Sequence, residues 1–437
     1  QFKEKESEKF LFGLDFELTG AQKRVFSDIR KDMESKKTMS RLLQGDVGSG
    51  KTVVAALALL QSLANGFQGI FMAPTEILAE QHFLNFKQLL NNFDYNIHLL
   101  TGSVKAAERN QIENEIESGK TDLVIGTHAL FQEGLNYDNP GLIVIDEQHR
   151  FGVEQRHSLK EKGDSPDLLI MTATPIPRSM AMLIYGDLDL SVIDEMPPGR
   201  KEIATFWRRE NRRKQIYAFL KEKIDEGRQA YIVCPLIEES EEMPDLVSAE
   251  ELYNNLYTGF LKDYELALIH SSIASDKKKE IMEKFRDGKI DVLVATTVIE
   301  VGVDVSNASI MVIENAERFG LAQLHQLRGR VGRGRYQSYC ILISDPPGDD
   351  ASRRLEIMCK SSNGFLIADQ DLKMRGPGEF FGTKQHGIED LKVASLIDDQ
   401  ALLVEAREEA QKIVAKENWQ QKYKNLAEII SKIELKI

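Results

Sequence analysis

"GDVGSGKT", Gly45 to Thr52, is the stretch that decides the fold of this 437-residue chain. It follows the apolar run "RLLQ" and precedes a longer apolar run that begins at Val53, which is the strand–loop–helix context of a phosphate-binding loop. Glycines let consecutive backbone N–H groups curl around phosphate oxygens, and the N-terminus of the following helix adds its dipole. The stretch therefore predicts a nucleotide site in an α/β domain.

Residue types within this loop predict individual roles. Lys51 is expected to reach the β- and γ-phosphates, and the hydroxyl of Thr52 is expected to ligate Mg²⁺. The expected nucleotide-binding residues of the loop are Gly45, Gly48, Ser49, Gly50, Lys51 and Thr52. A glycine-rich turn with an incidental lysine is the plain alternative, but the agreement of pattern and context disfavours it.

Short apolar runs alternate with helical patterns along most of the chain. "RLLQG", "GIFMAP", "NIHLL", "TDLVIGT", "LIVIDE" and "DLLIMTAT" indicate buried strands in a first block, and "QAYIVCP", "YELALIHS", "DVLVATT", "SIMVIENA" and "SYCILIS" in a second. Continuously apolar strands between helices indicate parallel sheets covered on both faces. "EMPPGR" at 195–200 predicts a linker, and the acidic stretch 237–251 predicts a solvated loop. We expect domains at 1–196, 197–345 and 346–437.

Composition limits the environment and the partners. The formal net charge of -13 argues against a broadly basic surface, so a nucleic-acid partner must be held by local clusters of Lys and Arg. Three scattered cysteines form no metal-binding spacing and fit a reducing compartment, with the cytoplasm as the default. The longest apolar run, 53–64, is too short to span a bilayer, so no membrane association is expected. A chain that begins with Gln1 is expected to be a fragment.

A pair of carboxylates ends the apolar run "LIVIDEQH", 142–149. Asp146 at the end of the strand would hold Mg²⁺ through water, and Glu147 would take the proton from the attacking water. An Asp-Glu pair after a strand is often only a solvated turn. The phosphate-binding loop upstream in the same block favours the catalytic interpretation.

Six motifs together resemble superfamily 2 helicases. "GDVGSGKT", "APTEILAEQH", "DEQHRFGVEQR", "TATPIPR", "ATTVIEVGVDV" and "QLHQLRGRVGRG" occur in the order and spacing of that family. The resemblance implies two RecA-like parallel-sheet domains in tandem, with ATP in the cleft between them. It also implies arginine fingers at Arg330 and Arg333, which would stabilise charge in the transition state. Further implied roles are nucleotide binding by Gln22 and Gln326, and coupling of hydrolysis to motion by Thr172, Thr174, Gly302 and Asp304.

Several of these motifs resemble more narrowly the RecG branch, bacterial helicases that act on stalled forks and junctions. In that branch a small, mainly helical C-terminal region converts domain closure into a stroke on duplex DNA, and "LKMRGPGEFFGTKQHG", 372–387, matches its lever segment. The resemblance also implies a wedge domain before the motor, and we expect this chain to be a fragment that lacks it. The resemblance implies nucleic-acid contacts or a part in translocation for Thr75, Thr101, Gly102, Thr127, His128, Thr296, Arg375 and Gln385.

The expected function is that of an ATP- and Mg²⁺-dependent double-stranded DNA translocase of the RecG type, which regresses forks and migrates branches. Its expected partners are duplex and branched DNA, with single-strand-binding protein as a candidate, and the expected state is a monomer in the bacterial cytoplasm at the nucleoid. Three alternatives stay open: the motor of a transcription-repair coupling factor, an RNA helicase, and an ATP-gated clamp that does not move.

Overall fold

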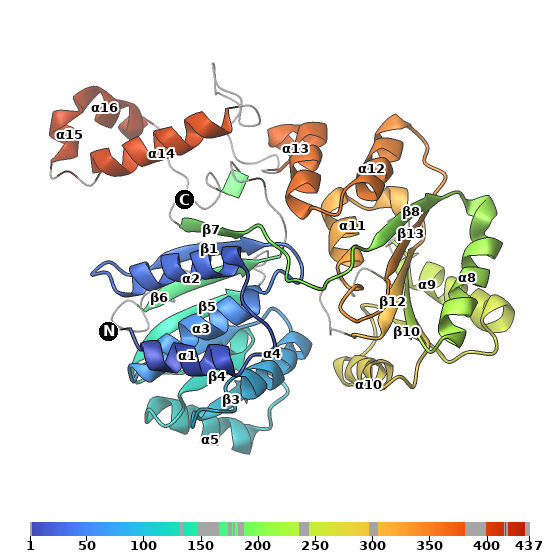
Figure 1. The fold of residues 1–437 in the computed structure, drawn as a ribbon, viewed down its shortest axis with the longest axis horizontal. Helices are drawn as coiled ribbons and strands as arrows, with labels where there is room; N and C mark the ends of the chain where they lie inside the picture. Colours follow the sequence, from blue (N-terminus) through green and yellow to red (C-terminus); the bar gives the residue numbers. More distant parts are fainter. Residues whose placement is uncertain are drawn as a thin grey trace.

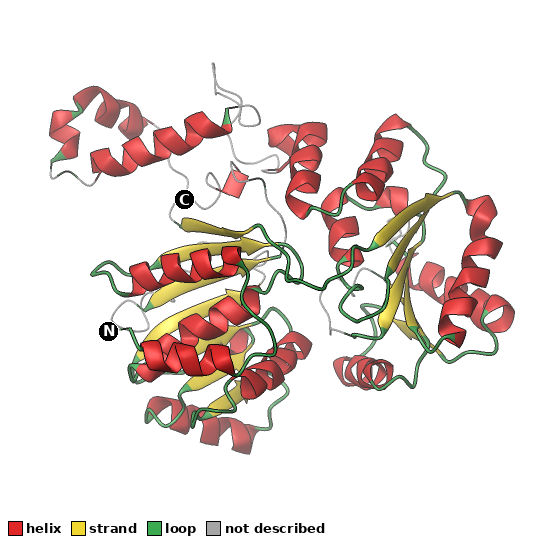
Figure 2. Cartoon of the chain, in the orientation of Figure 1, coloured by secondary structure: helices red, strands yellow, loops and turns green. Residues whose placement is uncertain are grey.

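The computed structural model describes residues 2–131, 134–146, 166–173, 177, 180–181, 188–235, 244–296, 305–380, 399–414, 416 and 418–432. Within these residues the chain forms two parallel β-sheets, each covered by helices on both faces, and a helical C-terminal region (Figures 1 and 2). The predicted α/β class with two parallel sheets is confirmed. The predicted domain boundaries fall in connections between elements and stay predictions.

The first sheet has seven strands in the order β3-β4-β2-β5-β6-β1-β7. The strands are β1 (Ser40–Gly45), β2 (Gln68–Met72), β3 (Ile97–Leu100), β4 (Leu123–Gly126), β5 (Pro140–Asp146), β6 (Asp167–Thr172) and β7 (Asp189–Ile193). Every neighbouring pair is parallel. The carboxyl ends of the strands therefore meet at one edge, where ligands bind in open α/β sheets.

The second sheet repeats this topology. Its strands are β8 (Ala204–Arg208), β9 (Gln229–Val233), β10 (Leu266–Ile269), β11 (Val292–Ala295), β12 (Ala308–Ile313) and β13 (Tyr339–Ile343). Their order, β10-β11-β9-β12-β13-β8, matches the order β3-β4-β2-β5-β6-β1 strand for strand. The first sheet differs only in the additional edge strand β7.

Helices connect the strands and follow them. Those of the first block are α1 (Glu4–Phe12), α2 (Gly20–Met33), α3 (Lys51–Ala64), α4 (Glu76–Leu89), α5 (Ala106–Glu117) and the 3₁₀ turn η1 (His128–Phe131). The second block has η3 (Glu210–Arg212), α8 (Arg213–Asp225), α9 (Pro244–Asn255), the π-helical η4 (Leu256–Phe260), α10 (Ser275–Arg286), η6 (Ala316–Arg318) and α11 (Leu321–Arg328). The C-terminal region has α12 (Asp349–Lys360), α13 (Gly364–Phe380), α14 (Gln400–Val414), α15 (Trp419–Lys422) and α16 (Lys424–Lys432).

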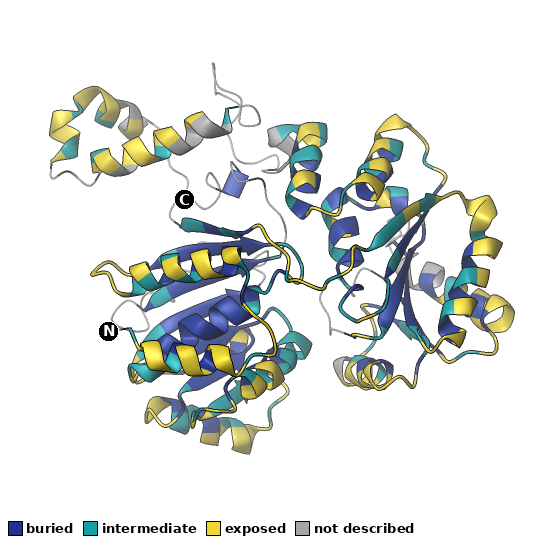
Figure 3. Ribbon diagram, viewed as in Figure 1, coloured by how far each residue is buried: buried dark blue, intermediate teal, exposed yellow. Residues whose placement is uncertain are grey.

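The hydrophobic core lies on both faces of each sheet, because successive residues of a strand point to opposite sides. In β1, Leu43 packs against α3 and its neighbours, while Leu42 belongs to the core of the opposite face. In β9, Tyr231 and Ile232 likewise belong to the cores on opposite faces of the second sheet. Figure 3 shows the strands as the most buried part of both blocks. This double burial explains why the strands read as continuous apolar runs.

A buried glutamine begins the same strand in each sheet. Nε2 of Gln68, at the start of β2, donates to two carbonyl oxygens near the ends of the α5–β4 connection, at 3.0 and 2.9 Å. Nε2 of Gln229, at the start of β9, donates likewise near the ends of the α10–β11 connection, at 2.5 and 2.7 Å. The two sheets thus satisfy the same buried backbone groups with the same side chain, although the sequence shows no repeat.

Three local expectations need correction or completion. Each apolar run contains a strand, but the edge strands β7 and β8 were not predicted. The expected loop at 237–251 is wrong from Pro244 onward, where α9 begins. Ala249 and Leu256 are buried, and Leu252 and Tyr253 pack against the same core, so the helical spacing outweighs the acidic composition. "EMPPGR" is irregular, as predicted, and none of the described helices is long and apolar enough to cross a membrane.

The paired glutamines lead to a stability prediction. Gln68→Leu keeps the volume of the side chain but takes the side-chain donor from the Thr121 carbonyl and the acceptor from the Asp138 N–H, so we expect the free energy of unfolding to fall by about 1–3 kcal/mol. Urea titration followed by circular dichroism measures it. Gln111→Leu, at an exposed position on α5, is the matched control and should change little. Equal losses in the two variants would contradict the role assigned to Gln68.

Candidate active site

The loop between β1 and α3, Gly45–Thr52, forms a cradle, and we call it the phosphate loop. Gly48 and Gly50 have φ values of 75° and 85°, which side chains other than glycine rarely adopt. The ammonium of Lys51 donates to the carbonyl oxygens of Gly45 at 2.8 Å and Asp46 at 3.1 Å, so the lysine folds back over the loop. The loop conformation suits a phosphate site, and the predicted contact of Lys51 with phosphates stays a prediction.

Polar atoms of the loop fit an anionic ligand. Oγ of Ser49 is buried and has no hydrogen-bond partner within the described residues. Lys51 is 9% exposed, and Thr52, next to it in the first turn of α3, is half-buried. A nucleotide's phosphates would give these groups the partners that the loop itself only partly supplies. The residues present therefore fit the phosphates of a nucleotide.

Both polar atoms of the Gln22 amide form hydrogen bonds, one of them with the phosphate loop. Its Oε1 accepts from the backbone N–H of Thr19 at 2.8 Å, and its Nε2 donates to the carbonyl of Ser49 at 2.8 Å. The hydroxyl of Thr19 in turn accepts from the Gln22 N–H at 3.2 Å, which completes a capping box at the start of α2. Gln22 thus braces the loop, and its predicted contact with a nucleotide base stays a prediction.

Asp146 ends β5 at the same edge of the sheet as the phosphate loop. One of its oxygens, Oδ2, lies 2.9 Å from Nε2 of His82, which is buried on α4. Thr172, also buried, ends β6, the strand between β5 and β1. The predicted base and the other coupling residues, Glu147, Thr174, Gly302 and Asp304, lie outside the described residues.

Helix α11 and the turn after it bring cations toward the phosphate loop from the second sheet. A Cβ at Gly329 would lie 2.8 Å from Cβ of Val47, so the end of α11 packs directly on the loop. Burial, reinforced by the charge of Arg200, lowers the pKa of Arg333 to about 10, which leaves the side chain protonated at neutral pH. Arg330 and the predicted nucleotide contact Gln326 lie on this same segment, both half-buried.

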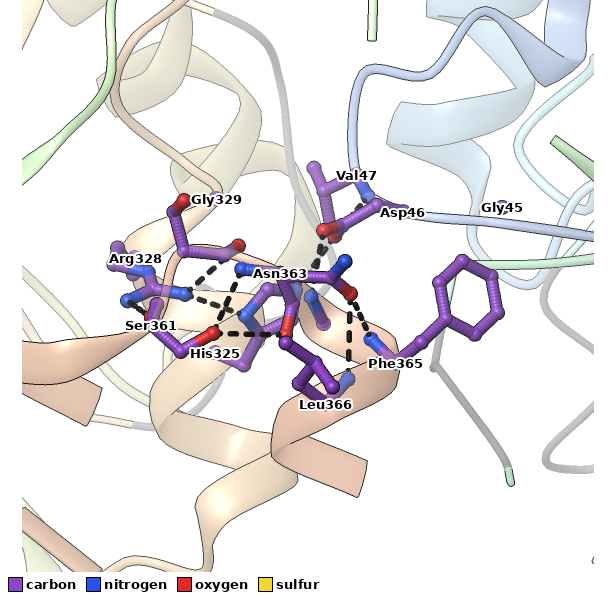
Figure 4. A network of polar contacts seen from close by, with 12 residues as sticks. Gly45, Asp46, Val47, His325, Arg328, Gly329, Ser361, Asn363, Phe365 and Leu366 are labelled. Carbon is purple, nitrogen blue, oxygen red and sulfur yellow. Dashed lines mark hydrogen bonds and ion pairs between the residues drawn. The ribbon is translucent and has the colours of Figure 1, made fainter. Parts of the chain in front are cut away.

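A network of polar contacts centred on Asp46 joins the two sheets (Figure 4). Oδ1 of Asp46 lies 2.6 Å from Nε2 of His325 on α11, and Oδ2 accepts from the backbone N–H of Gly364, the first residue of α13, at 3.1 Å. Nδ1 of His325 lies 2.9 Å from Nη2 of Arg328. Arg328 also donates to the carbonyls of Met358 and of Ser361 at 2.9 and 2.8 Å. The phosphate loop is therefore connected to the α12–α13 turn.

Electrostatics favour the ionised form of Asp46. Burial alone would raise the pKa of Asp46, but the hydrogen bond and charge of His325, with the backbone N–H groups of Val47 and Gly364, outweigh it and lower the pKa. A carboxyl with a depressed folded-state pKa stabilises the fold above its unfolded-state pKa and loses that contribution as the pH falls through the folded-state value. At neutral pH the network therefore contributes in full.

Arg200, from the linker between the sheets, covers the phosphate loop. Its Nη1 donates to the carbonyl of Val47 at 2.6 Å, and a Cβ at Gly48 would overlap that guanidinium. Burial lowers the pKa of Arg200, which the nearby charge of Asp46 opposes. Together with the linker, α11 and the α12–α13 turn, the loop lines a cavity of about 360 Å³.

Sequence reasoning missed Asp46, His325, Arg328 and Arg200 as site residues. The first three lie inside motifs that were recognised, "GDVGSGKT" and "QLHQLRGRVGRG", and the fourth ends the linker "EMPPGR". Their presence in these motifs was a signal, but their partners lie too far away in the chain to be paired without the fold.

The predicted nucleic-acid contacts gather at the carboxyl edges of the sheets. Thr75, Thr101 and Thr127 follow β2, β3 and β4, and Thr296 follows β11, the counterpart of β4. Thr101, Thr127 and Thr296 are at most 3% exposed, so their hydroxyls are not open to a phosphate as the structure stands. His128 is exposed. The edge position agrees with the prediction, and the individual contacts stay untested.

The predicted lever begins in α13, which touches both halves of the molecule. Ile367 belongs to the core of the second sheet, and Leu372 to that of the first. Nε of Arg375 donates to Oδ1 of Asp371 at 3.0 Å, one turn earlier. Gly376 then breaks the helix with φ 73° and ψ 163°, which confirms a bend at this glycine-rich stretch. Gln385 lies outside the described residues.

Three family models match successive parts of the chain. DEAD/DEAH box helicase matches residues 19–183, and helicase conserved C-terminal domain matches residues 211–335. "ATP-dependent DNA helicase RecG, domain 3, C-terminal" matches residues 361–434. The first two models correspond to the two sheets, and the third to α13–α16.

Individual proteins are similar over nearly the whole chain. An ATP-dependent DNA helicase RecG from Streptococcus pneumoniae is 52% identical over 93% of this chain and 60% of its own length. One from Thermotoga maritima is 52% identical over 93% of this chain and 52% of its own length. The solved structure of RecG bound to a three-way DNA junction superposes with a TM-score of 0.78 at 48% identity, covering 92% of this chain and 52% of that one. The chain thus spans between 52% and 60% of these relatives.

Glycine substitutions test the bracing of the phosphate loop. Gly50→Ala and Gly66→Ala both place a side chain at a φ above 80°, which costs about 1–2 kcal/mol. Only at Gly50 would the new Cβ also displace the buried amide of Gln22 from Ser49, whereas the space around Gly66 is open. We expect Gly50→Ala to lose a further ~1–3 kcal/mol in urea titration. Equal losses would show that Gln22 does not brace the loop.

Proposed function

Since the chain belongs to the RecG family of ATP-dependent DNA helicases, we propose that it hydrolyses ATP to move along double-stranded DNA. The proposed outcome is remodelling of stalled replication forks and branched recombination intermediates by fork regression and branch migration. The observation that carries the proposal is the shared carboxylate of Asp46. It binds the phosphate loop to α11 and to the first residue of α13 at once.

The proposed chemistry is attack of water on the γ-phosphate. Lys51 would exchange its two loop carbonyls for phosphate oxygens, and Thr52 and Asp146 would hold Mg²⁺. When bound, Mg²⁺ neutralises charge on the phosphate oxygens. Glu147 would accept the proton of the water, and Arg330 and Arg333 would stabilise the charge that develops on the phosphate. Closure of the two sheets would bring these arginines to the nucleotide.

The proposed coupling runs through the Asp46 network. Phosphates entering the loop would compete with the present partners of Asp46, Val47 and Lys51, because these groups surround the space that the phosphates need. A change at Asp46 acts on His325 and on the N-terminus of α13 together. Helix α13 would carry it to Arg375 and the bend at Gly376, and from there to duplex DNA.

Duplex and branched DNA are the proposed partners, since the similar RecG structure contains a three-way junction. A monomer, an association with single-strand-binding protein, and a place at the nucleoid in the bacterial cytoplasm belong to the same proposal. The motor of a transcription-repair coupling factor, an RNA helicase and a static clamp are the remaining alternatives. The 48–52% identity to RecG proteins favours RecG over the first two of these.

Displacement of a triplex-forming strand from duplex DNA tests the proposed motor. We expect ATP-dependent displacement by the unaltered chain, and its loss in both Lys51→Ala and Glu147→Gln, because the first removes a phosphate ligand and the second the proposed base. Loss of displacement should accompany a fall in ATPase rate of about 10²-fold or more. Displacement that survived Glu147→Gln would rule out hydrolysis-driven movement by this site, and ATPase without displacement in the unaltered chain would favour the clamp.

Arg375→Ala should separate hydrolysis from movement. Arg375 lies on α13 and lines neither the phosphate loop nor the cavity beside Asp46, so we expect DNA-stimulated ATPase to stay within about twofold of the unaltered chain while triplex displacement is lost. Lys373→Ala, which removes an exposed cation from the same helix, is the control. A parallel loss of both activities in Arg375→Ala would contradict its assignment to the lever.

A further inference from the structure

We infer that His82 is a positioning residue for Asp146, and that α4 uses it to transmit the state of the DNA-facing edge to the ATPase site. The inference rests on the proposed function and adds to it a regulatory connection. None of the motif roles expected from the sequence includes His82.

The contact between His82 and Asp146 is direct and shielded. Nε2 of His82 lies 2.9 Å from Oδ2 of Asp146, and the two side chains are 9% and 14% exposed. An ionised carboxylate can only accept, so Nε2 carries the proton and donates it. This bond fixes the rotation of the carboxylate and leaves Oδ1 for the metal shell, as outer-shell partners do for carboxylate ligands.

Packing holds the imidazole ring in place. The rings of His82 and Phe71 have centroids 4.5 Å apart, and Phe71 in turn packs against Phe86 one turn further along α4. Nδ1 of His82 is buried and has no hydrogen-bond partner within the described residues. Asp146 is thus the only polar partner of this ring among those residues, and α4 cannot shift without moving the donor.

The beginning of α4 reaches the edge where nucleic acid is proposed to bind. The hydroxyl of Thr75 caps the helix by accepting from the N–H of Leu78 at 3.4 Å. Oε1 of Glu76 accepts from the backbone N–H of Ser103 at 3.1 Å, in the loop that holds Thr101 and Gly102. Only six residues, about 9 Å of helix, separate Glu76 from His82. A phosphate bound at this edge would therefore act on α4 close to its histidine.

A cation of the second sheet also contacts α4. Nζ of Lys279 on α10 lies 2.6 Å from Oε1 of Glu80, and Figure 1 shows the two helices facing each other between the blocks. The hydrogen bond with Glu80 raises the pKa of Lys279, so this ammonium is charged at neutral pH. The exposed pair is itself worth at most about 1 kcal/mol. The pair matters here for its position and not for its energy. Through it, an approach of the second sheet would act on the same helix that carries His82.

These contacts make α4 a rigid connection. Within seven residues it has two points that receive a signal and one that passes it on. DNA acts on Glu76, closure acts on Glu80, and the response reaches Asp146 through His82. The consequence is that Asp146 takes its metal-binding orientation most often when DNA and the second sheet are both in place. Hydrolysis would then depend on DNA without any contact between DNA and nucleotide.

The test compares two amide substitutions of His82. The side-chain nitrogen of Gln can reach the position of Nε2, whereas that of Asn reaches only the position of Nδ1. We expect His82→Asn to raise the Mg²⁺ concentration for half-maximal binding of a non-hydrolysable ATP analogue by about 10-fold, and His82→Gln to restore most of the loss. Fluorescence titration of the labelled analogue measures this without turnover.

ATPase rates with and without duplex DNA form the second readout. His82→Asn should lose most of the stimulation by DNA, while its affinity for DNA stays unchanged. His98→Asn is the matched control, because His98 forms a comparable pair with Glu115 at 3.0 Å, away from the phosphate loop. It should match the unaltered chain in both readouts.

Three outcomes are decisive. Unchanged Mg²⁺ dependence and DNA stimulation in His82→Asn would overturn the inference while leaving the proposed function intact. Equal defects in His82→Asn and His82→Gln would reduce His82 to a packing residue. Absence of DNA-stimulated ATPase in the unaltered chain would instead sink the proposed function itself. If His82→Asn fails to fold, Lys279→Met tests the same helix from an exposed position, and unchanged stimulation by DNA in that variant overturns the inference.

Discussion

One carboxylate, that of Asp46, serves two halves of the molecule. It accepts from Val47 in its own loop, from Gly364 at the start of α13, and it pairs with His325 on α11. Hydrogen bonds to charged groups contribute about 1.5–3 kcal/mol each, and a buried partner left behind costs a similar amount. The phosphate loop therefore cannot withdraw from the second sheet at little cost. It must exchange these partners for others, which a bound nucleotide would have to compensate.

Because the two sheets share one topology, the edge that carries the phosphate loop in the first sheet can be compared with the same edge of the second. At the corresponding edge of the second sheet, α8 begins with Arg213 where α3 begins with Lys51, and Glu314 follows β12 where Asp146 ends β5. Arg213 and Glu314 form an ion pair at 2.6 Å, and the hydroxyl of Tyr217 donates to the other oxygen of Glu314 at 2.7 Å. The second sheet thus fills with its own side chains the place that the first leaves for a ligand. The contribution of the second sheet's block to the phosphate loop comes instead from α11, through His325.

Sequence reasoning predicted what local pattern determines. The apolar runs located every central strand because those strands are buried on both faces, and "GDVGSGKT" located the phosphate loop because its conformation needs glycine. The edge strands β7 ("DLSVI") and β8 ("ATFWR") were missed because polar residues interrupt their apolar runs, whereas the other edge strands, β3 and β10, were located by theirs. Helix α9 was missed because the acidic residues of this stretch outweighed, in the interpretation, the helical spacing of Ala249 and Leu252 in α9 and of Leu256 in η4, which follows it.

The contacts between the halves could not be predicted, since 279 residues separate His325 from Asp46 and 318 separate Gly364 from Asp46. Nothing in either local pattern states that the two ends meet. The motifs show which residues are candidates, and only the fold shows which of them are partners. The same holds for His82, the last residue of "APTEILAEQH", whose partner Asp146 lies 64 residues further along the chain.

Helix α13 is suited to carry a displacement because it is anchored in two cores. Ile367 packs with the second sheet and Leu372 with the first, so the helix lies across the boundary between the halves. From Gly364 to Arg375 it spans about 16 Å without a break, and the Asp371–Arg375 pair links its last two turns. A shift at the Asp46 end would therefore act on the whole of this unbroken segment. The first residue that can absorb it is Gly376, whose φ of 73° already departs from the helix. In the proposed coupling, motion that starts at the phosphate loop would be delivered to the segment that follows this glycine.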